Sequence, residues 1–83
     1  MPRPRHDELD WAAMSLQEIL RLAIADEEEA RDYYRHAAAM AGDCRTRRLL
    51  LSLSSMEQEH ADTLRKELEE LTLQRSLEEG IAD

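Results

Sequence analysis

The sequence predicts an all-α protein, an antiparallel two-helix hairpin that dimerises into a four-helix bundle. The composition is helical: Ala, Leu, Glu and Arg dominate, Phe is absent, and only two Gly and two Pro occur in 83 residues. Apolar residues recur at helical spacing on both sides of a break at Gly42. Two helices of this length bury too little surface to stand alone, so oligomerisation is expected.

The two ends of the chain are predicted to be tails. Pro2, Pro4 and several charges disfavour regular structure in the N-terminal tail, residues 1–13. Trp11 is the exception there, and two placements stay open for it: against a neighbouring subunit or against the first helix. The helical hairpin occupies residues 14–79, and Gly80 is expected to end it before a C-terminal tail at 80–83.

The first helix begins at a clear capping signal. Ser15 and Glu18 have the spacing of a capping box, in which a serine side chain and a glutamate side chain pair with each other's backbone N–H groups. The helix is expected to run to about Met40. Gly42 follows and is expected to take the left-handed conformation that ends many helices.

The second helix is expected from about Arg45 to about Leu77. Asp43 or Thr46 is suited to cap its start, because a short side-chain oxygen can accept from the unpaired N–H groups of the first turn. The connection between the helices is short, so they should lie antiparallel.

The charge and the single cysteine exclude several kinds of partner. A formal charge of -8 argues against binding nucleic acid or an anionic membrane surface. Cys44 is the sole cysteine, so no intrachain disulfide can form, which fits a reducing compartment. The N-terminus has no apolar signal core, and no run approaches the roughly 18 apolar residues of a membrane span. A cytoplasmic location is therefore expected.

Polar residues interrupt the apolar stripe of each predicted helix. Both stripes follow a repeating spacing of three and four residues, which places their members on one face. The first comprises Leu16, Leu20, Ala23, Glu27, Ala30, Tyr34, Ala37 and Ala41, and the second Leu50, Leu53, Glu57, His60, Leu64 and Leu71. A carboxylate buried in such a seam costs on the order of several kcal/mol unless it is paired or bound to a cation.

The polar residues of the two stripes should lie at the same height. Glu27 is 15 residues before Gly42 and Glu57 is 15 residues after it. At about 1.5 Å of rise per residue, both glutamates are equally far from the turn. His60 is three residues after Glu57, so their side chains meet on one face.

This arrangement suits half of a carboxylate-bridged dimetal site. In four-helix di-iron proteins, two helices each give a Glu and the other two each give Glu-x-x-His. A two-fold dimer of this hairpin would supply two copies each of Glu27, Glu57 and His60, with Glu57 bridging two irons about 3.5–4 Å apart. Hard carboxylate oxygens and borderline imidazole suit iron or manganese, and Zn²⁺ or Ca²⁺ is expected to substitute.

The segments Glu27-Glu28-Glu29-Ala30-Arg31-Asp32-Tyr33-Tyr34 and Glu57-Gln58-Glu59-His60-Ala61 resemble the rubrerythrin and ferritin-like pattern. The two-helix length and the 30-residue interval from Glu27 to Glu57 look most like encapsulated ferritins, over roughly residues 16–72. Those proteins complete a ferritin-like four-helix bundle and its ferroxidase centre only on dimerisation.

The resemblance implies roles for particular residues and partners. Glu27, Glu57 and His60 match the family's iron ligands, and Tyr34 matches a tyrosine near them, with Tyr33 at the preceding aromatic position. Glu29 and Asp26 match acidic positions linked to metal uptake. The resemblance also implies a ring of dimers such as a decamer, and an encapsulin shell as partner. Encapsulated ferritins usually end in a shell-targeting peptide, and residues 77–83 show no evident equivalent.

The predicted function is oxidation of Fe²⁺ to Fe³⁺ for iron storage at a site formed between two subunits. Two other classes stay open. One is a di-iron peroxidase of rubrerythrin type, although the chain lacks the cysteine pairs of a rubredoxin-like module. The other is a metal-free helical dimerisation module in which Glu27 and His60 merely pair.

The remaining polar residues are expected to be structural or solvated. His36 points away from Glu27, His6 belongs to the tail, and neither is expected to be a ligand. Glu28 and Glu59 are expected to face solvent. The arginines of both helices are expected to form salt bridges, each of them weak.

Overall fold

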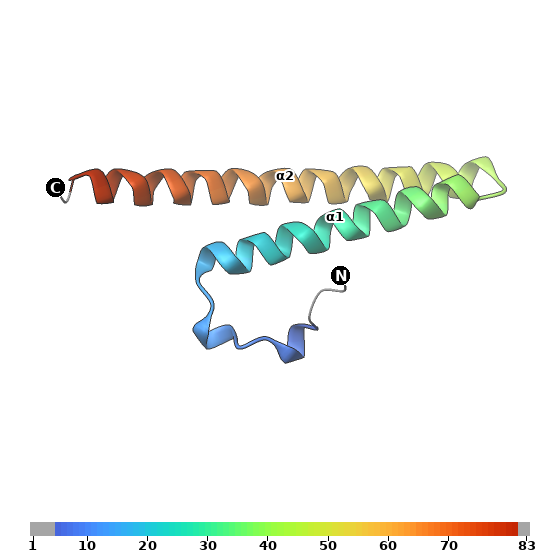
Figure 1. The fold of residues 1–83 in the computed structure, drawn as a ribbon. Coiled ribbons are helices and arrows are strands. Elements are labelled where there is room, and N and C mark those ends of the chain that lie inside the picture. Colours follow the sequence, from blue (N-terminus) through green and yellow to red (C-terminus); the bar gives the residue numbers. More distant parts are fainter. Residues whose placement is uncertain (1–4, 82–83) are drawn as a thin grey trace.

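A computed structural model describes residues 5–81 and shows two long antiparallel helices (Figure 1). Helix α1 spans Leu16–Met40 and helix α2 spans Cys44–Ile81. Two 3₁₀ turns precede them, η1 at His6–Glu8 and η2 at Trp11–Ala13. The described residues contain no strand, so the all-α, two-helix prediction is confirmed.

Helix α1 begins as predicted and ends differently. The Ser15 hydroxyl accepts the backbone N–H of Glu18 at 3.1 Å, which is the serine half of the capping box. Gly42 does not adopt a positive φ, so the predicted left-handed ending is wrong. The chain leaves the helix one residue earlier, because Ala41 is extended, with φ -67° and ψ 133°. The Arg47 guanidinium donates to the Ala41 carbonyl at 3.0 Å and thereby satisfies an acceptor that the helix leaves unpaired.

Helix α2 is capped by Asp43 and runs past its predicted end. The Asp43 carboxylate accepts the Thr46 backbone N–H at 2.8 Å and the Thr46 hydroxyl at 2.6 Å. The prediction that Gly80 ends the helix is wrong, since α2 continues to Ile81. Gly80 is exposed, and a helical glycine costs only about 1 kcal/mol relative to alanine, so the helix continues through it.

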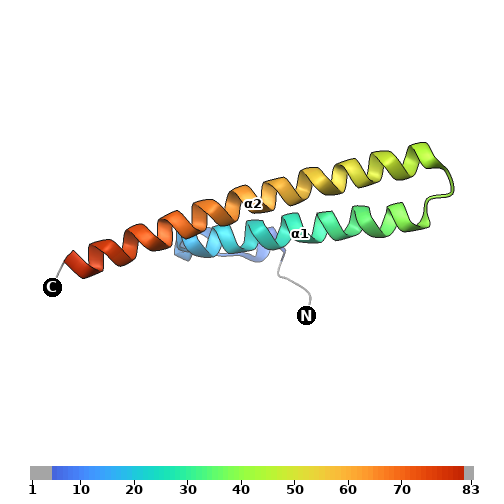
Figure 2. The same ribbon diagram turned by 90° about the horizontal axis from the view of Figure 1, so that it is seen from above.

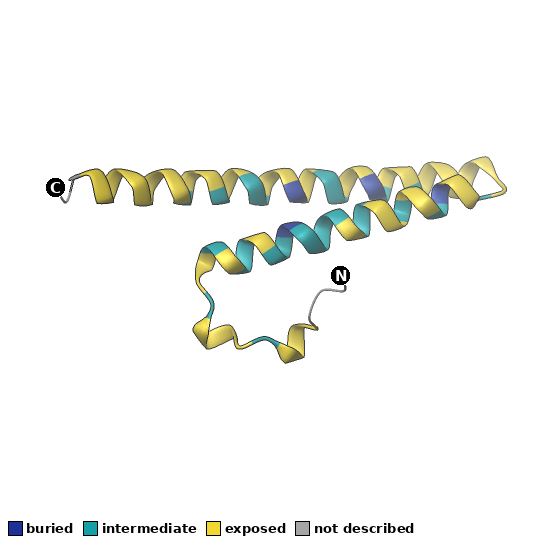
Figure 3. Ribbon diagram, in the orientation of Figure 1, coloured by how far each residue is buried: buried dark blue, intermediate teal, exposed yellow. Residues whose placement is uncertain are grey.

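The core between the helices is thin. Among the described residues, only Ile24, Ala38 and Ala61 are buried apolar residues, and Ser54 is a buried polar one. Figure 3 shows these positions along the facing sides of the two helices, with half-buried residues around them. Two of the three buried apolar side chains are alanines, which lets the helices approach closely but contributes little buried area.

The molecule is elongated. Its principal extents are 61 × 27 × 18 Å and its radius of gyration is 17.1 Å, compared with about 12 Å for a compact domain of this length. Part of the excess comes from α2, whose C-terminal part extends beyond the start of α1 (Figures 1 and 2). No described helix combines the length and apolar character needed to cross a membrane.

The N-terminal segment folds back along α1 on the side away from α2 (Figure 1). His6 Nε2 lies 2.9 Å from the Asp26 carboxylate of α1. The Trp11 indole N–H donates to the His6 carbonyl at 3.0 Å, and the two rings meet edge to face at 6.0 Å. These contacts order two short turns within the predicted N-terminal tail, whose residues 1–4, with Pro2 and Pro4, lie outside the described residues. Trp11 packs against His6 and remains 45% exposed, so its place against a neighbouring subunit stays a prediction.

Candidate metal centre

Glu27 projects from the middle of α1 into the edge of the seam. It lies three residues after Ile24, one of the buried core residues, so the two side chains occupy the same side of the helix. The Glu27 side chain is 28% exposed. The backbone of α1 is continuous through this position, so the carboxylate stands on a rigid element rather than a loop.

Glu57 and His60 project toward Glu27 from α2. They are three residues apart, and the buried residues Ser54 and Ala61 flank them along the helix. His60 Nδ1 lies 3.4 Å from Glu27 Oε2 and 3.8 Å from Glu57 Oε2. The prediction that Glu27 and Glu57 lie level with each other is therefore confirmed in this hairpin.

The three side chains form a group that fits a metal ion. Each offers one ligand atom, and these atoms all lie within 4.8 Å of one another; no other group of three or more such residues occurs in the described chain. Two carboxylate oxygens and one imidazole nitrogen are donors suited to iron, manganese or zinc. One chain supplies three donors, which leaves the site incomplete as a dinuclear centre.

In the single hairpin the site is partly open to solvent. The Glu57 side chain is 23% exposed, whereas that of His60 is 55% exposed. The group thus lies at one edge of the seam. An ion held there would be accessible from this open side.

The two carboxylates oppose each other electrostatically. The pKa of Glu27 is raised, mainly because its carboxyl shares a hydrogen bond with Glu57, and further by burial and by the negative charge of Glu57. His60 acts in the opposite direction and lowers the pKa of Glu27 by hydrogen bonding and charge. A cation between the carboxylates would remove the repulsion that otherwise favours a bound proton.

Tyr33 and Tyr34 lie about two turns after Glu27 on α1. Tyr34 is half-buried, Tyr33 is 68% exposed, and their rings meet edge to face with centroids 5.5 Å apart. Together with Ala30, Asp26 and Glu29 they line an open hollow on α1. The structure thus places the two acidic residues predicted for metal uptake beside the tyrosines. Asp26 contacts His6, as described above.

A network of polar side chains crosses the seam next to the ligands. Salt bridges of the arginines were expected, but this network between the helices was not. Arg31 of α1 donates to the Gln58 side chain of α2 at 2.8 Å, and Arg65 of α2 donates to Glu28 of α1. Glu28 was expected to face solvent, and that expectation is wrong: its side chain is 34% exposed and pairs with both arginines. The spacings Glu28-x-x-Arg31 and Asp62-x-x-Arg65 were the available signal.

His36 and Glu59 are exposed, as predicted.

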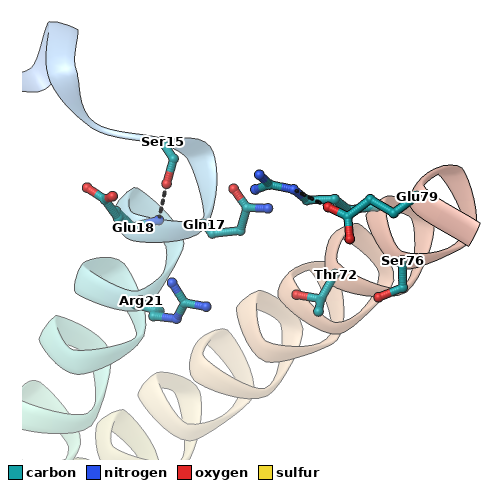
Figure 4. A pocket seen from close by; sticks show the side chains of 8 residues that line it. Ser15, Gln17, Glu18, Arg21, Thr72, Ser76 and Glu79 are labelled. Carbon is teal, nitrogen blue, oxygen red and sulfur yellow. Dashed lines mark hydrogen bonds and ion pairs between the residues drawn. The ribbon is translucent and has the colours of Figure 1, made fainter. Parts of the chain in front are cut away.

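A second hollow, of about 410 Å³, lies near the start of α1 and the C-terminal part of α2 (Figure 4). Arg21 and Thr72 face each other across it, and Ser15 and Glu18 lie at its rim. Two arginines and two glutamates among its lining residues cancel in formal charge. The hollow is therefore a polar surface groove, distinct from the metal-ligand group. Its lining residues are Ser15, Gln17, Glu18, Arg21, Thr72, Arg75, Ser76 and Glu79.

Comparison with known proteins agrees with the ligand pattern. The model of the Rubrerythrin family matches residues 13–81, which covers both helices. No curated protein and no solved structure gives a significant match. The match supports a di-iron protein of the ferritin-like superfamily and carries nothing specific to encapsulated ferritins. The chain belongs to the Rubrerythrin family.

Proposed function

We propose that two copies of the hairpin pair to form a ferroxidase centre that oxidises Fe²⁺ to Fe³⁺. The observation that carries the proposal is the convergence of Glu27, Glu57 and His60 at one open edge of the seam. A two-fold partner would bring a second set of three ligands against the first. The complete site would hold two ions with four carboxylates and two imidazoles.

The surface around the ligands supports a partner at this edge. Met56, one helical turn before His60, is 48% exposed, and Leu49 on the same side of α2 is 60% exposed. Three apolar residues among those described are buried, and most of the apolar stripe of each helix is only half-buried. A second copy would bury this surface and exclude water from the ligand group.

Each ligand residue of this chain would have its own role. Glu27 and Glu57 would bind the substrate Fe²⁺, and their negative charge would favour the ferric over the ferrous state. His60 would complete the donor set and, through its position at the exposed rim, border the path of the oxidant. Two Fe²⁺ ions supply two electrons, which with two protons reduce O₂ to hydrogen peroxide. Iron supplies the redox chemistry, while the protein supplies the donors and their placement.

Further parts of the proposal come from the family resemblance. Tyr34 would lie near the ligands of the partner chain, and Asp26 and Glu29 would attract ions before they reach the centre. Because a two-helix protein cannot enclose a mineral, the Fe³⁺ would pass to a separate store. An encapsulin shell in the cytoplasm, loaded with a ring of dimers such as a decamer, would provide one.

The test is an anaerobic titration of the metal-free protein with Fe²⁺, followed by admission of O₂. We expect one Fe²⁺ per chain, which is two per dimer, and oxidation monitored by the ultraviolet absorption of Fe³⁺. Glu57→Ala and His60→Ala should each abolish binding, since either removes one of three donors. Glu59→Ala is the matched control, because Glu59 is an exposed glutamate between the two ligands. Absence of Fe²⁺ binding by the unaltered protein would leave a metal-free dimerisation module as the function.

A peroxidase is the second candidate, and the match to the Rubrerythrin family favours it. In that case the same ligands would hold iron as a resident cofactor, and an external reductase would return electrons. The two candidates differ in stoichiometry. A ferroxidase consumes Fe²⁺ and accumulates Fe³⁺, whereas a peroxidase consumes hydrogen peroxide and the reductant in equal amounts without net iron oxidation.

A further inference from the structure

Five side chains that cross the seam next to the ligands form a closed circuit, which we call the polar ring. Its members are Glu28, Arg31, Gln58, Asp62 and Arg65. Arg31 donates to Gln58 at 2.8 Å, and the Gln58 amide donates to Asp62 at 2.9 Å. Arg65 then contacts Asp62 at 3.6 Å and donates to Glu28, which returns to Arg31 at 3.7 Å.

Arg31 is the centre of the polar ring. Its side chain is only 18% exposed, and its Nε also donates to Asp32 at 2.9 Å. The backbone carbonyl of Arg31 accepts the hydroxyl of Ser54, itself 3% exposed, at 3.2 Å. One residue of α1 is thus tied to α2 through both its side chain and its backbone.

The polar ring and the metal ligands alternate along the same turns. Glu28 directly follows Glu27, and Gln58 directly follows Glu57. Adjacent residues of a helix are about 100° apart, so Glu28 and Gln58 point to a different side from Glu27 and Glu57, whereas Arg31, four residues after Glu27, shares its face of α1. Any rotation of either helix that displaced a ligand would also displace its neighbour in the ring.

Other forces specify the register weakly. The buried apolar residues Ala38 and Ala61 are small, and small side chains tolerate sliding better than interlocking large ones. Glu27 and Glu57 repel each other when both are charged, so the ligand group does not hold itself together without a cation. The best-supported role of polar contacts within a helix seam is to fix the register of one helix against the other.

We propose that Arg31, through Gln58 and the polar ring, is a positioning residue that aligns Glu27 of α1 with Glu57 and His60 of α2 for metal binding. The inference rests on the metal centre proposed above. A slip of one residue would move the helices by about 1.5 Å. The contacts of Arg31 with Gln58 and of Arg65 with Glu28 both cross the seam and would both have to rearrange, so the ring favours one register.

The experiment compares Co²⁺ binding, followed by visible absorption, in four forms of the full 83-residue chain. Arg31→Met removes the guanidinium and keeps most of the aliphatic stem, and Gln58→Met breaks the same contact without a change of charge. Arg75→Met is the matched control, because Arg75 pairs only with Glu79 among the described residues, within α2 and away from the ligands. Glu57→Ala identifies the absorption that belongs to the proposed centre.

The sign of the effect separates positioning from simple electrostatics. Loss of a positive charge near two carboxylates should by itself strengthen the binding of a cation. We expect the opposite: Arg31→Met should weaken Co²⁺ binding about tenfold or more, the order seen when groups that orient metal ligands are removed. Gln58→Met should weaken it in the same direction, and Arg75→Met should leave it unchanged. The spectrum of the Co²⁺-saturated Arg31→Met protein should also change, since the ligands would no longer meet in the same geometry.

Each result has a defined meaning. Unaltered Co²⁺ affinity and spectrum in both Arg31→Met and Gln58→Met, with binding still abolished in Glu57→Ala, would overturn the positioning role and leave the proposed metal centre intact. Failure of the unaltered protein to bind Co²⁺ at Glu57 would overturn both. Helicity is measured alongside by circular dichroism, and if Arg31→Met loses helical structure, Gln58→Met decides the outcome.

Discussion

The negative charge of Glu27 is unfavourable in the metal-free site. Its carboxyl shares a hydrogen bond with Glu57 and lies partly buried beside that like charge, and both effects raise its pKa. His60 offsets this only in part. A functional site that holds two acids together without a cation sacrifices some stability for the ability to bind one.

This raised pKa predicts a pH-dependent difference between the metal-free protein and its Glu27→Gln variant. A group whose pKa is raised on folding stabilises the protein below its unfolded-state pKa, ordinarily 4.5, and loses this contribution as the pH rises through the folded-state pKa. The free energy of unfolding of Glu27→Gln should therefore equal that of the unaltered protein in acid. At neutral pH it should be higher by about 0.5 kcal/mol, the order of a partly exposed charge interaction.

Urea denaturation across a pH series, with a chelator present, measures this difference. Glu59→Gln serves as the control, since it removes an exposed charge two residues from Glu57. A difference between Glu27→Gln and the unaltered protein that grew toward acid pH would contradict the expected direction.

At the scale of the helices, caps and polar contacts define boundaries that the apolar pattern leaves open. Ser15 begins α1 and Asp43 begins α2, and each satisfies a backbone N–H that no helical carbonyl can reach. Ala41 and Arg47 end α1 without a glycine in the left-handed conformation. The turn is therefore held by side-chain hydrogen bonds from both flanking helices.

The cap predicts the effect of Asp43→Ala. This change should lower the free energy of unfolding by about 1 kcal/mol, as for loss of other N-cap side chains. Asp10→Ala is a suitable control, because Asp10 precedes η2 but makes no side-chain capping hydrogen bond. The two variants are compared by thermal denaturation, and equal effects would show that the Asp43 contacts contribute nothing of their own.

At the scale of the whole molecule, the hairpin has too little core for its surface. An extent of 61 Å and only three buried apolar residues among those described are unlike a self-sufficient domain. Some exposed apolar residues lie on the side of the ligands and others on the side of the polar ring. Met56 lies one turn from His60, whereas Leu51 lies two turns before Gln58, on the side of the polar ring.

This asymmetry predicts which face carries the partner. Met56→Glu should shift the protein toward monomer, because it would bury a charge in the proposed interface. Leu51→Glu should leave the assembly intact, and it is a close match, since Leu51 is 47% and Met56 48% exposed. Sedimentation velocity measures both, with Fe²⁺ or Ca²⁺ present and after chelation.

Metal should favour the larger species, since the proposed centre takes its ligands from two chains. Equal disruption by Met56→Glu and Leu51→Glu would contradict a partner confined to the ligand face. So would an assembly unchanged by either metal or chelation.

The sequence by itself determined the helices and the approach of the three proposed ligands. Helical periodicity is local, and the equal distances of Glu27 and Glu57 from the turn follow from the constant rise of a helix. It misplaced the features that depend on a single backbone conformation, namely the ending at Gly42 and the continuation through Gly80. It also did not reveal the contact of Trp11 with His6, because a short apolar segment has many packing options.

Only the tertiary structure decided how exposed the ligand group is and which side chains form the polar ring next to it. The polar ring joins residues up to 37 positions apart, and the spacing within each helix does not reveal which side chains meet across a seam. The same holds for the exposure of His60, which depends on how the two helices are rotated about their axes. Periodicity fixes which residues share a face, but the rotation and register of one helix against the other arise from contacts between residues distant in the chain.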